Sequence, residues 1–365
     1  MSRMIYYFTI IFLGSILHAK TLQEMYNNAN PGEGYNKLIV LEKDSIYTGG
    51  FIQSVESVCI HGNDGIIDLF GSSIIVDGDD TILDIDHCVI KSSTDTPKVF
   101  LEYRNNSYGK ITNNTFYGLF NNKKSSLAVY FEECTKDTSA IRNNIFYNFS
   151  ASLYFYTLNE DVFFEGIPLH IEYNLHWECE ISYLYYAGWV GYARPFIPLP
   201  GNGELIEPPE FISPLENNFG LSEESICIDN GIETEFEYNG NSPDLGAIES
   251  SYSIFRGTKL SGIITDDLVI SNSPYIIIND IYIPAGEKMH INPGVEIKIN
   301  YLKSIIVNGE LNISGTVIDS VKITNNSYYS IPWGHIIFEK TASINSKIEY
   351  TRIEYGTGIW NERGT

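Results

Sequence analysis

Alanine is scarce in this chain, and so are basic side chains. Only 10 of the 365 residues are Ala, whereas 52 are Ile and 32 are Asn. Ala is the best helix former and Ile suits a pleated strand, so this balance disfavours a helical protein. With 30 Gly and 14 Pro available for turns, the composition predicts an all-β fold built from many short strands.

The shortage of positive charge excludes one class of partner. The 23 Lys and Arg residues stand against 46 Asp and Glu residues, which gives a formal net charge of −23. A nucleic-acid backbone is bound by clustered Lys and Arg, so we expect no nucleic-acid partner. The acidic balance is compatible with a solvated exterior, with cations, and with neutral or basic partners.

Long apolar runs are missing after the N-terminus. Residues 1–19 contain Arg3, an apolar stretch from Met4 to Leu17, and the small residue Ala19. This pattern predicts a signal peptide cleaved near Ala19. A membrane anchor is the alternative, but the run is shorter than the ~20 residues that a span requires. We expect a secreted or cell-surface protein, with no transmembrane segment in the mature chain.

Cysteine is too sparse and too scattered for a disulfide framework. The five residues form no CxxC pair, so the spacing does not indicate a zinc site. We expect buried free thiols, and one disulfide remains an open alternative. Sequence motifs for phosphate loops, nucleophile elbows and HExxH metal sites are also missing. The cysteines are Cys59, Cys88, Cys134, Cys179 and Cys227.

Internal repeats carry the prediction of the fold. Three similar heptapeptides begin at Ile111, Ile141 and Ile171, at intervals of 30 residues, and related segments begin at Ile85 and Ile348. A fixed period of this length is the signature of a solenoid. Each unit is a short apolar stretch, a polar turn and another short apolar stretch, with no run long enough for a helical repeat.

The repeats therefore predict stacked parallel strands with their Ile side chains inside. Asn114, Asn144 and Asn174 share one position at a corner, where successive Asn side chains can hydrogen-bond along the stack. Asn also tolerates the left-handed backbone conformation that such corners require.

These rungs resemble the right-handed parallel β-helix proteins of the pectin-lyase-like superfamily. The resemblance rests on the Ile-x-Asn-Asn-x-Phe rungs, on Val58-Cys-Ile-His-Gly and Ile74-Ile-Val-Asp-Gly, and on Ser225-Ile-Cys-Ile-Asp-Asn-Gly with Ser242-Pro-Asp-Leu-Gly. It covers most of residues 35–250 and implies a right-handed parallel β-helix solenoid. Its motifs specify the fold far better than an activity.

The sequence predicts a second β-helix after the first. We assign residues 20–250 to the first β-helix, with an aromatic and Pro-rich loop at 183–214, and residues 251–259 to a linker. Residues 260–365 are predicted to be the N-terminal rungs of a second, incomplete β-helix. An open solenoid end exposes strand edges, so we expect either a truncated product or a partner that covers the end.

Paired carboxylates are the recurrent candidates for chemistry. Asp84 and Asp86 flank the inward Ile85, so both point outward with Cα atoms about 6.6 Å apart. This spacing suits a glycosidase pair or a shared cation, and a solvated acidic face is the alternative. The catalytic candidates are Asp79, Asp80, Asp84, Asp86 and, as a base, Arg142. The calcium candidates are Asp77, Asp79, Asp84 and Asp86.

The aromatic loop is the candidate sugar-binding surface. Its rings can stack on the C–H faces of sugars, and the alternative is that they only cover the side of the solenoid. The candidate ligand-binding residues are Tyr185, Tyr186, Trp189 and Tyr192.

Two functions of different classes remain open. The first is a non-catalytic exported module that binds a polysaccharide or cell-surface glycan, or has an adhesive or structural role. The second is a polysaccharide lyase or glycoside hydrolase acting around Asp77–His87. The motifs of polygalacturonase-type enzymes are not met, because His61-Gly62 precedes Asp79-Asp80. A groove with a carboxylate pair and a nearby base would favour the enzyme, and a featureless rod the module.

Overall fold

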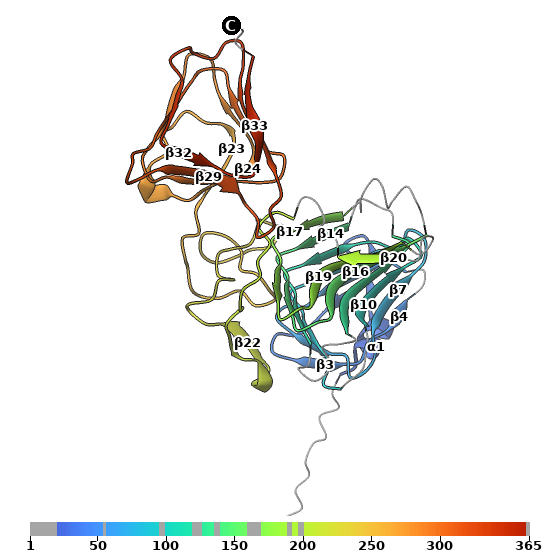
Figure 1. The fold of residues 1–365 in the computed structure, drawn as a ribbon. Helices are drawn as coiled ribbons and strands as arrows, with labels where there is room; N and C mark the ends of the chain where they lie inside the picture. Colours follow the sequence, from blue (N-terminus) through green and yellow to red (C-terminus); the bar gives the residue numbers. More distant parts are fainter. Residues whose placement is uncertain are drawn as a thin grey trace, which may run out of the picture.

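The protein is a β-solenoid of about 10 turns, nearly all β, with 47% strand and 4% helix. These features confirm the predicted fold class. The structure is a computed structural model, and it describes residues 20–53, 56–94, 99–118, 126–134, 139–158, 169–187, 192–195 and 201–362. The predicted signal peptide, 1–19, lies outside the described residues. Figure 1 shows the first set of stacked strands in blue to green and a second set in orange to red.

Three sheets form the faces of the first unit, and neighbouring strands in them are parallel except at two edge pairs, β1–β2 and β19–β20. The first sheet has the order β1 (Asn30–Gly32), β2 (Tyr35–Val40), β5 (Val58–His61), β8 (Leu83–Asp86), β11 (Lys110–Thr112), β14 (Ser139–Arg142) and β17 (Leu169–Glu172). The second sheet has the order β20 (Tyr192–Pro195), β19 (Ile181–Ala187), β16 (Ala151–Thr157), β13 (Leu127–Glu132), β10 (Val99–Arg104), β7 (Ile74–Asp77) and β4 (Ile52–Gln53). The third sheet has the order β18 (Leu175–Trp177), β15 (Ile145–Tyr147), β12 (Thr115–Tyr117), β9 (Val89–Lys91), β6 (Ile66–Asp68) and β3 (Ile46–Thr48).

The predicted inward isoleucines form one column of the core. Ile85 pairs with Ile111, Ile111 with Ile141 and Ile141 with Ile171, and each is at most 1% exposed. Side chains alternate across a strand, so the residues on either side of each Ile face outward from the first sheet. At the start of the solenoid lies α1 (Leu22–Asn28), whose capping box joins Thr21 and Glu24 and whose Leu22 is buried in the same core.

A ladder of buried asparagines runs along one corner. The Asn144 side chain donates to the carbonyls of Ile111 and Arg142 and accepts from the backbone N–H of Asn114. Asn174 repeats this pattern one turn later. The preceding residues, Asn113 and Asn143, adopt the left-handed conformation, with φ of 53° and 56°. One Asn of each pair therefore turns the chain, and the other joins successive turns.

The chain then turns back along the side of the first unit. Leu205 bridges to Leu175, and the irregular stretch that follows contains β21 (Phe211–Ser213), η2 (Pro214–Glu216) and β22 (Asn218–Leu221). Residues 225–250, which we call the return segment, lie against the corner of the solenoid. There the Ala247 N–H donates to Thr115 Oγ1 at 3.0 Å, and the Ile232 N–H donates to Asn143 Oδ1 at 2.9 Å.

A second core begins where the predicted linker ends. The main sheet of this unit has the order β32 (Thr351–Ile353), β29 (Val321–Asn325), β26 (Glu296–Ile299), β24 (Tyr275–Ile283), β27 (Ile305–Val307), β30 (Trp333–Phe338) and β33 (Gly356–Asn361), and β23 (Thr258–Ile263) pairs with β24. The smaller sheet has the order β25 (Lys288–Ile291), β28 (Glu310–Ser314) and β31 (Lys347–Glu349), and η3 (Ile270–Asn272) precedes β24. Their apolar side chains, including the fully buried Trp333, form a core of their own.

Direct hydrogen bonds join the two units. The Tyr301 N–H donates to Asn202 Oδ1 at 2.8 Å, and the Gly203 N–H donates to the carbonyl of Asn326 at 2.8 Å. Within the described ranges, no helix has the length and apolar character needed to cross a membrane.

Candidate functional site

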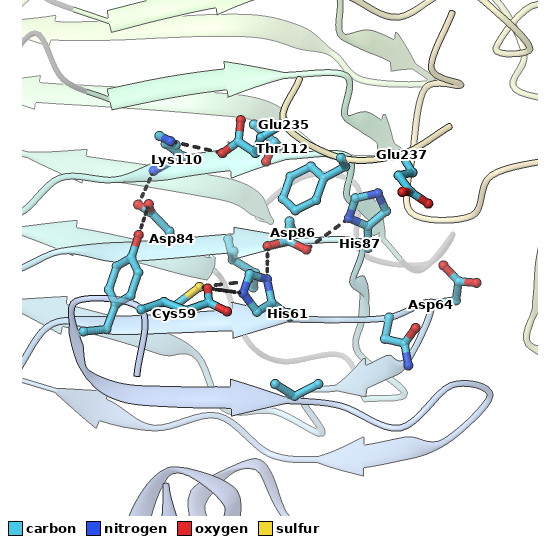
Figure 2. Close-up of a pocket in the computed structure, with 16 residues that line it drawn as sticks. Cys59, His61, Asp64, Asp84, Asp86, His87, Lys110, Thr112, Glu235 and Glu237 are labelled. Carbon is cyan, nitrogen blue, oxygen red and sulfur yellow. Dashed lines mark hydrogen bonds and ion pairs between the residues drawn. The ribbon is translucent and has the colours of Figure 1, made fainter. Parts of the chain in front are cut away.

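A cavity of about 740 Å³ opens on the outer face of the first sheet. Strands β5, β8 and β11 form its floor. One wall consists of Glu33, in the turn after β1, and Tyr35, at the start of β2. The other wall consists of Glu235, Phe236 and Glu237 of the return segment. Figure 2 shows the labelled side chains of the floor and of the return segment projecting into this space.

Strand register brings the reactive side chains of the floor together. Ile60 and Ile85 pair and point inward, so their neighbours point outward. Cys59 is therefore in register with Asp84, and His61 with Asp86. The two carboxylates predicted from the sequence thus lie in one cavity, with a histidine and a thiol on the adjacent strand.

Asp86 lies between two histidines. Its Oδ2 is 2.7 Å from His61 Nδ1, and its Oδ1 is 3.0 Å from His87 Nδ1. The other ring nitrogen of His61, Nε2, is 3.0 Å from Glu33 Oε2. Burial lowers the pKa of His61, but the hydrogen bonds and charges of Glu33 and Asp86 outweigh it, so the net shift is upward. This arrangement favours an imidazolium held between two carboxylates.

Asp84 occupies a different environment. The Tyr35 hydroxyl donates to its Oδ2 at 2.6 Å, and the backbone N–H of Lys110 donates to its Oδ1 at 2.7 Å. Burial raises the pKa of Asp84, and these two hydrogen bonds offset the increase only in part. The ammonium group of Lys110 points to Glu235 Oε1 at 3.1 Å and so ties the floor to the return segment.

Cys59 lies beside a histidine and a carboxylate, as a catalytic cysteine does, but its surroundings do not make it a nucleophile. Its Sγ is 3.6 Å from His61 Nε2 and 4.0 Å from Nδ1. Burial and the nearby charges of Asp86, Asp84 and Glu33 raise the pKa of the Cys59 thiol to about 12. A nucleophilic cysteine requires a thiolate near neutral pH, so this environment does not activate Cys59 for attack.

Phe236 supplies an apolar wall. Its ring lies edge-on to His87, with centroids 4.7 Å apart, and to His61, with centroids 6.4 Å apart. It is half-buried, so part of the ring borders the cavity. An aromatic ring beside carboxylates is a common combination in sites that hold a sugar through its C–H face and its hydroxyl groups.

The structure does not bring the four calcium candidates together. Asp77 ends β7 on the second sheet, where its Oδ1 accepts from Asn105 Nδ2 at 2.6 Å, and Asp79 accepts from Asn106 Nδ2 at 2.9 Å. Asp80 adopts a φ of 64° at the corner that follows. Because the chain turns there, Asp77 and Asp79 lie on a different face from Asp84 and Asp86. The catalytic candidates Asp79 and Asp80 are likewise outside the cavity lining.

Arg142 extends the column of outward residues beyond the cavity. It follows Asp86 and Thr112 in register, one strand past the cavity floor, and its Nε is 2.9 Å from Glu172 Oε1. It thus forms an ion pair on the surface of the sheet and is not among the lining residues.

The aromatic candidates have different surroundings. Tyr185 is 3% exposed and packs in the core, so it faces away from any surface ligand. Tyr186 is half-buried and stacks on Tyr156, with ring centroids 5.5 Å apart. Trp189 lies outside the described residues, and Tyr192 lies in β20 but its side chain is not described.

Sequence reasoning missed most of the cavity lining. It did not assign a role to Glu33, Tyr35, Cys59, Lys110 or Phe236. One signal was available: Val58-Cys-Ile-His and Leu83-Asp-Ile-Asp share an alternation 25 residues apart, which is one solenoid turn. That comparison would have placed Cys59 and His61 beside the two aspartates.

No family model matches the chain, and no curated protein or solved structure matches it either.

Proposed function

We propose that the chain is an exported glycoside hydrolase that acts on a polysaccharide or cell-surface glycan bound in the cavity of the first sheet. The observation that carries the proposal is the pair Asp84 and Asp86, side by side in one cavity but in contrasting environments. Glycosidases use two carboxyl groups, one protonated and one ionised, on either side of the scissile bond. Pairs of carboxyl groups with different surroundings are the usual source of that division.

The environments assign the two roles. Asp84 has a raised pKa, because burial outweighs its two hydrogen bonds, so it is the general acid that protonates the leaving oxygen. Asp86 lies between His61 and His87, each with a ring nitrogen at hydrogen-bond distance from one of its oxygens, and is the base or nucleophile. His61 has both ring nitrogens paired with carboxylates, so it positions Asp86 and is not itself the base.

The charge of the lining limits the substrate class. Its acidic residues outnumber its single lysine, Lys110. A polyuronate would be repelled by this surface, so the substrate is a neutral or amino-sugar glycan. This also disfavours a lyase, which removes the proton next to a substrate carboxylate. The acidic lining residues are Glu33, Asp64, Asp84, Asp86, Glu235 and Glu237.

We also infer that the chain is related to the pectin-lyase-like superfamily. This relationship is supported by the parallel sheets, the inward isoleucine column and the asparagine ladder. Export is supported by the N-terminal pattern around Arg3 and Ala19.

A screen for turnover tests the proposal. The secreted form, from Lys20 onward, is incubated with neutral, amino-sugar and acidic polysaccharides, and new reducing ends and unsaturated products are measured. We expect reducing ends without unsaturated products, and a loss of about 100-fold or more in rate for Asp84→Asn and for Asp86→Asn. Asp77→Asn and Asp79→Asn are matched controls, because both lie outside the cavity. Equal rates for all four variants would contradict the proposed site.

A binding or adhesive module is the second candidate, and a ladder of tyrosines favours it. On the outward side of the second sheet, Tyr130 and Tyr154 lie tilted to each other with centroids 5.3 Å apart, and Tyr156 stacks on Tyr186 with centroids 5.5 Å apart. All four side chains are half-buried. Stacked rings on a flat sheet suit a sugar chain. Glycan binding that is lost in Tyr156→Ala, without turnover by the unmodified chain, would favour this function over the hydrolase.

A further inference from the structure

At one end of the cavity, three side chains place three different kinds of metal-ligand atom close together. Glu33, Cys59 and His61 contribute a carboxylate oxygen, a sulfur and a ring nitrogen, and these atoms all lie within 4.8 Å of one another. Cys59 and His61 come from β5, and Glu33 comes from the turn after β1, where its φ is 52°. We propose that Glu33, Cys59 and His61 form a zinc site that opens into the cavity.

The distance between the sulfur and the ring nitrogen fits a small tetrahedral ion. With Zn–S near 2.3 Å and Zn–N near 2.05 Å, tetrahedral zinc holds its sulfur and nitrogen ligands about 3.6 Å apart. Cys59 Sγ and His61 Nε2 are 3.6 Å apart, and His61 Nε2 and Glu33 Oε2 are 3.0 Å apart. Because Sγ also lies 4.0 Å from Nδ1, the sulfur stands beside the ring, and the thiol must turn toward Nε2 on binding.

The surroundings of His61 are those of a metal ligand. Histidines that bind zinc usually donate their second ring N–H to a carboxylate, which fixes the tautomer. Here His61 Nδ1 is 2.7 Å from Asp86 Oδ2, and Asp86 is held in turn by His87 Nδ1 at 3.0 Å. This orientation leaves Nε2 as the nitrogen that faces Cys59 and Glu33.

The ligand chemistry selects zinc over calcium. Calcium prefers six to eight oxygen ligands, whereas a thiolate with an imidazole suits zinc. Three protein ligands beside an open cavity leave a fourth position for water or substrate, as in catalytic zinc sites. Binding replaces the thiol proton of Cys59 with the ion, so at least one proton is released for each zinc.

This inference rests on the geometry of the three side chains and not on the proposed hydrolase. Binding needs no glycan, and of the two carboxylates at which turnover is tested, Asp84 has no contact with His61 and separates the two proposals, whereas Asp86→Asn is expected to affect both. Failure of one proposal therefore leaves the other standing.

Metal titration of the full secreted chain tests the site. The protein is treated with chelator, dialysed and titrated with Zn²⁺ by calorimetry in two buffers of different ionisation enthalpy, which reports proton release. We expect one zinc for each chain and a release of at least one proton, that of the Cys59 thiol. Co²⁺ in place of Zn²⁺ should give a thiolate-to-metal absorption band. Stoichiometric binding of Ca²⁺ without Zn²⁺, or no binding of either ion, would overturn the proposal.

Variants identify the ligands. Cys59→Ser and His61→Gln should each weaken zinc binding by about 100-fold, and Asp86→Asn, which acts through His61, by about 10-fold. Glu33→Gln should weaken it while retaining the cobalt absorption band, because the thiolate remains. Cys134→Ser and His335→Gln are matched controls elsewhere in the fold and should bind as the unmodified chain does. If a variant does not fold, the cobalt band of the unmodified chain still decides, since its absence excludes the Cys59 thiolate as a ligand.

Discussion

Glu249 is a carboxylate in an unusual setting within the return segment. Its two oxygens accept backbone N–H groups from Asn239 and Asp244, each at 3.1 Å. Burial, together with the charge of Asp244, raises the pKa of Glu249 to about 7. The neighbouring Asp244 and Asp229 are likewise engaged by backbone N–H groups and cap turns of the same segment.

This pKa predicts a pH-dependent stability. The folded chain retains the proton on Glu249 up to about pH 7, whereas the unfolded chain releases it near pH 4.5. The resulting stabilisation is complete below pH 4.5 and is lost as the pH rises through 7. Glu249→Gln should therefore show a shallower fall in unfolding free energy over this range, by about 1 kcal/mol after allowance for partial exposure.

Urea unfolding at pH 4.5 and pH 8 measures this difference. Glu223→Gln changes an exposed carboxylate of the same region and is the control. Identical pH slopes for the unmodified chain and Glu249→Gln would show that Glu249 does not hold the proton in the folded state.

Phe236 is expected to contribute to substrate binding, but not to the chemical step, at the proposed hydrolase site. Its ring borders the cavity and contacts His87, but it carries no group that transfers a proton. Phe236→Leu should raise KM by about 10-fold and change kcat by much less, because it removes binding common to substrate and transition state. Steady-state kinetics on the substrate found in the screen would check this, with the exposed Phe255→Leu as control. An equal loss in kcat would assign Phe236 to the positioning of Asp86.

The asparagine ladder is the element that the sequence predicts best. Its 30-residue period is visible because identical residues recur where identical geometry recurs, as in the rungs of Ile111, Ile141 and Ile171. The same period leads from Asn174 to Glu204, whose Oε1 accepts the backbone and side-chain N–H groups of Asn174 at 3.2 and 3.0 Å. The repeat did not predict Glu204, because a Glu carboxylate there takes the place of the Asn amide at the end of the ladder.

Removing one asparagine side chain from the ladder should lower the unfolding free energy substantially. Asn144→Ala leaves the buried N–H of Asn114 without its partner and removes one donor each from the carbonyls of Ile111 and Arg142. Buried groups that lose a partner cost about 1–3 kcal/mol each, so we expect a total loss of about 3–5 kcal/mol. Urea unfolding measures it, with the exposed Asn345→Ala as control. A loss below about 1 kcal/mol would mean that water takes over these hydrogen bonds.

The cavity is harder to predict than the ladder for a physical reason. Its floor follows from the strand alternation around Ile60 and Ile85, which is a local pattern. Its far wall comes from Glu235, which meets Lys110 across 125 residues of sequence. Contacts at such separations depend on the path of the whole chain, and no local pattern in the sequence encodes them. The misassignment of Tyr185 to a surface has a related cause, since the core side of β19 also consists of tyrosines.

At the scale of the whole molecule, hydrogen bonds from buried residues join the two units. Asn202 is 4% exposed, and its Oδ1 accepts the Tyr301 N–H. Asn202→Ala should leave that N–H without a partner and lower the stability of the junction by about 1–2 kcal/mol. Hydrogen exchange followed by mass spectrometry should show faster exchange around Tyr301, with exchange in the isoleucine column of the first unit unchanged. Unaltered exchange around Tyr301 would show that the junction does not depend on this bond.

The return segment also fixes the order in which the cavity can be completed. The strands of the first sheet join neighbours about 25–30 residues away, so they can pair soon after they are made. The hydrogen bonds that join Asn113 to Asp244 and Thr115 to Ala247, in contrast, can form only after more than 130 further residues have been made. Because the chain is synthesised from its N-terminus, the turns of the first unit can stack before the return segment, which forms one wall of the cavity, has been made. During synthesis, the side chains of the floor therefore stay open to solvent until almost two thirds of the sequence has been made.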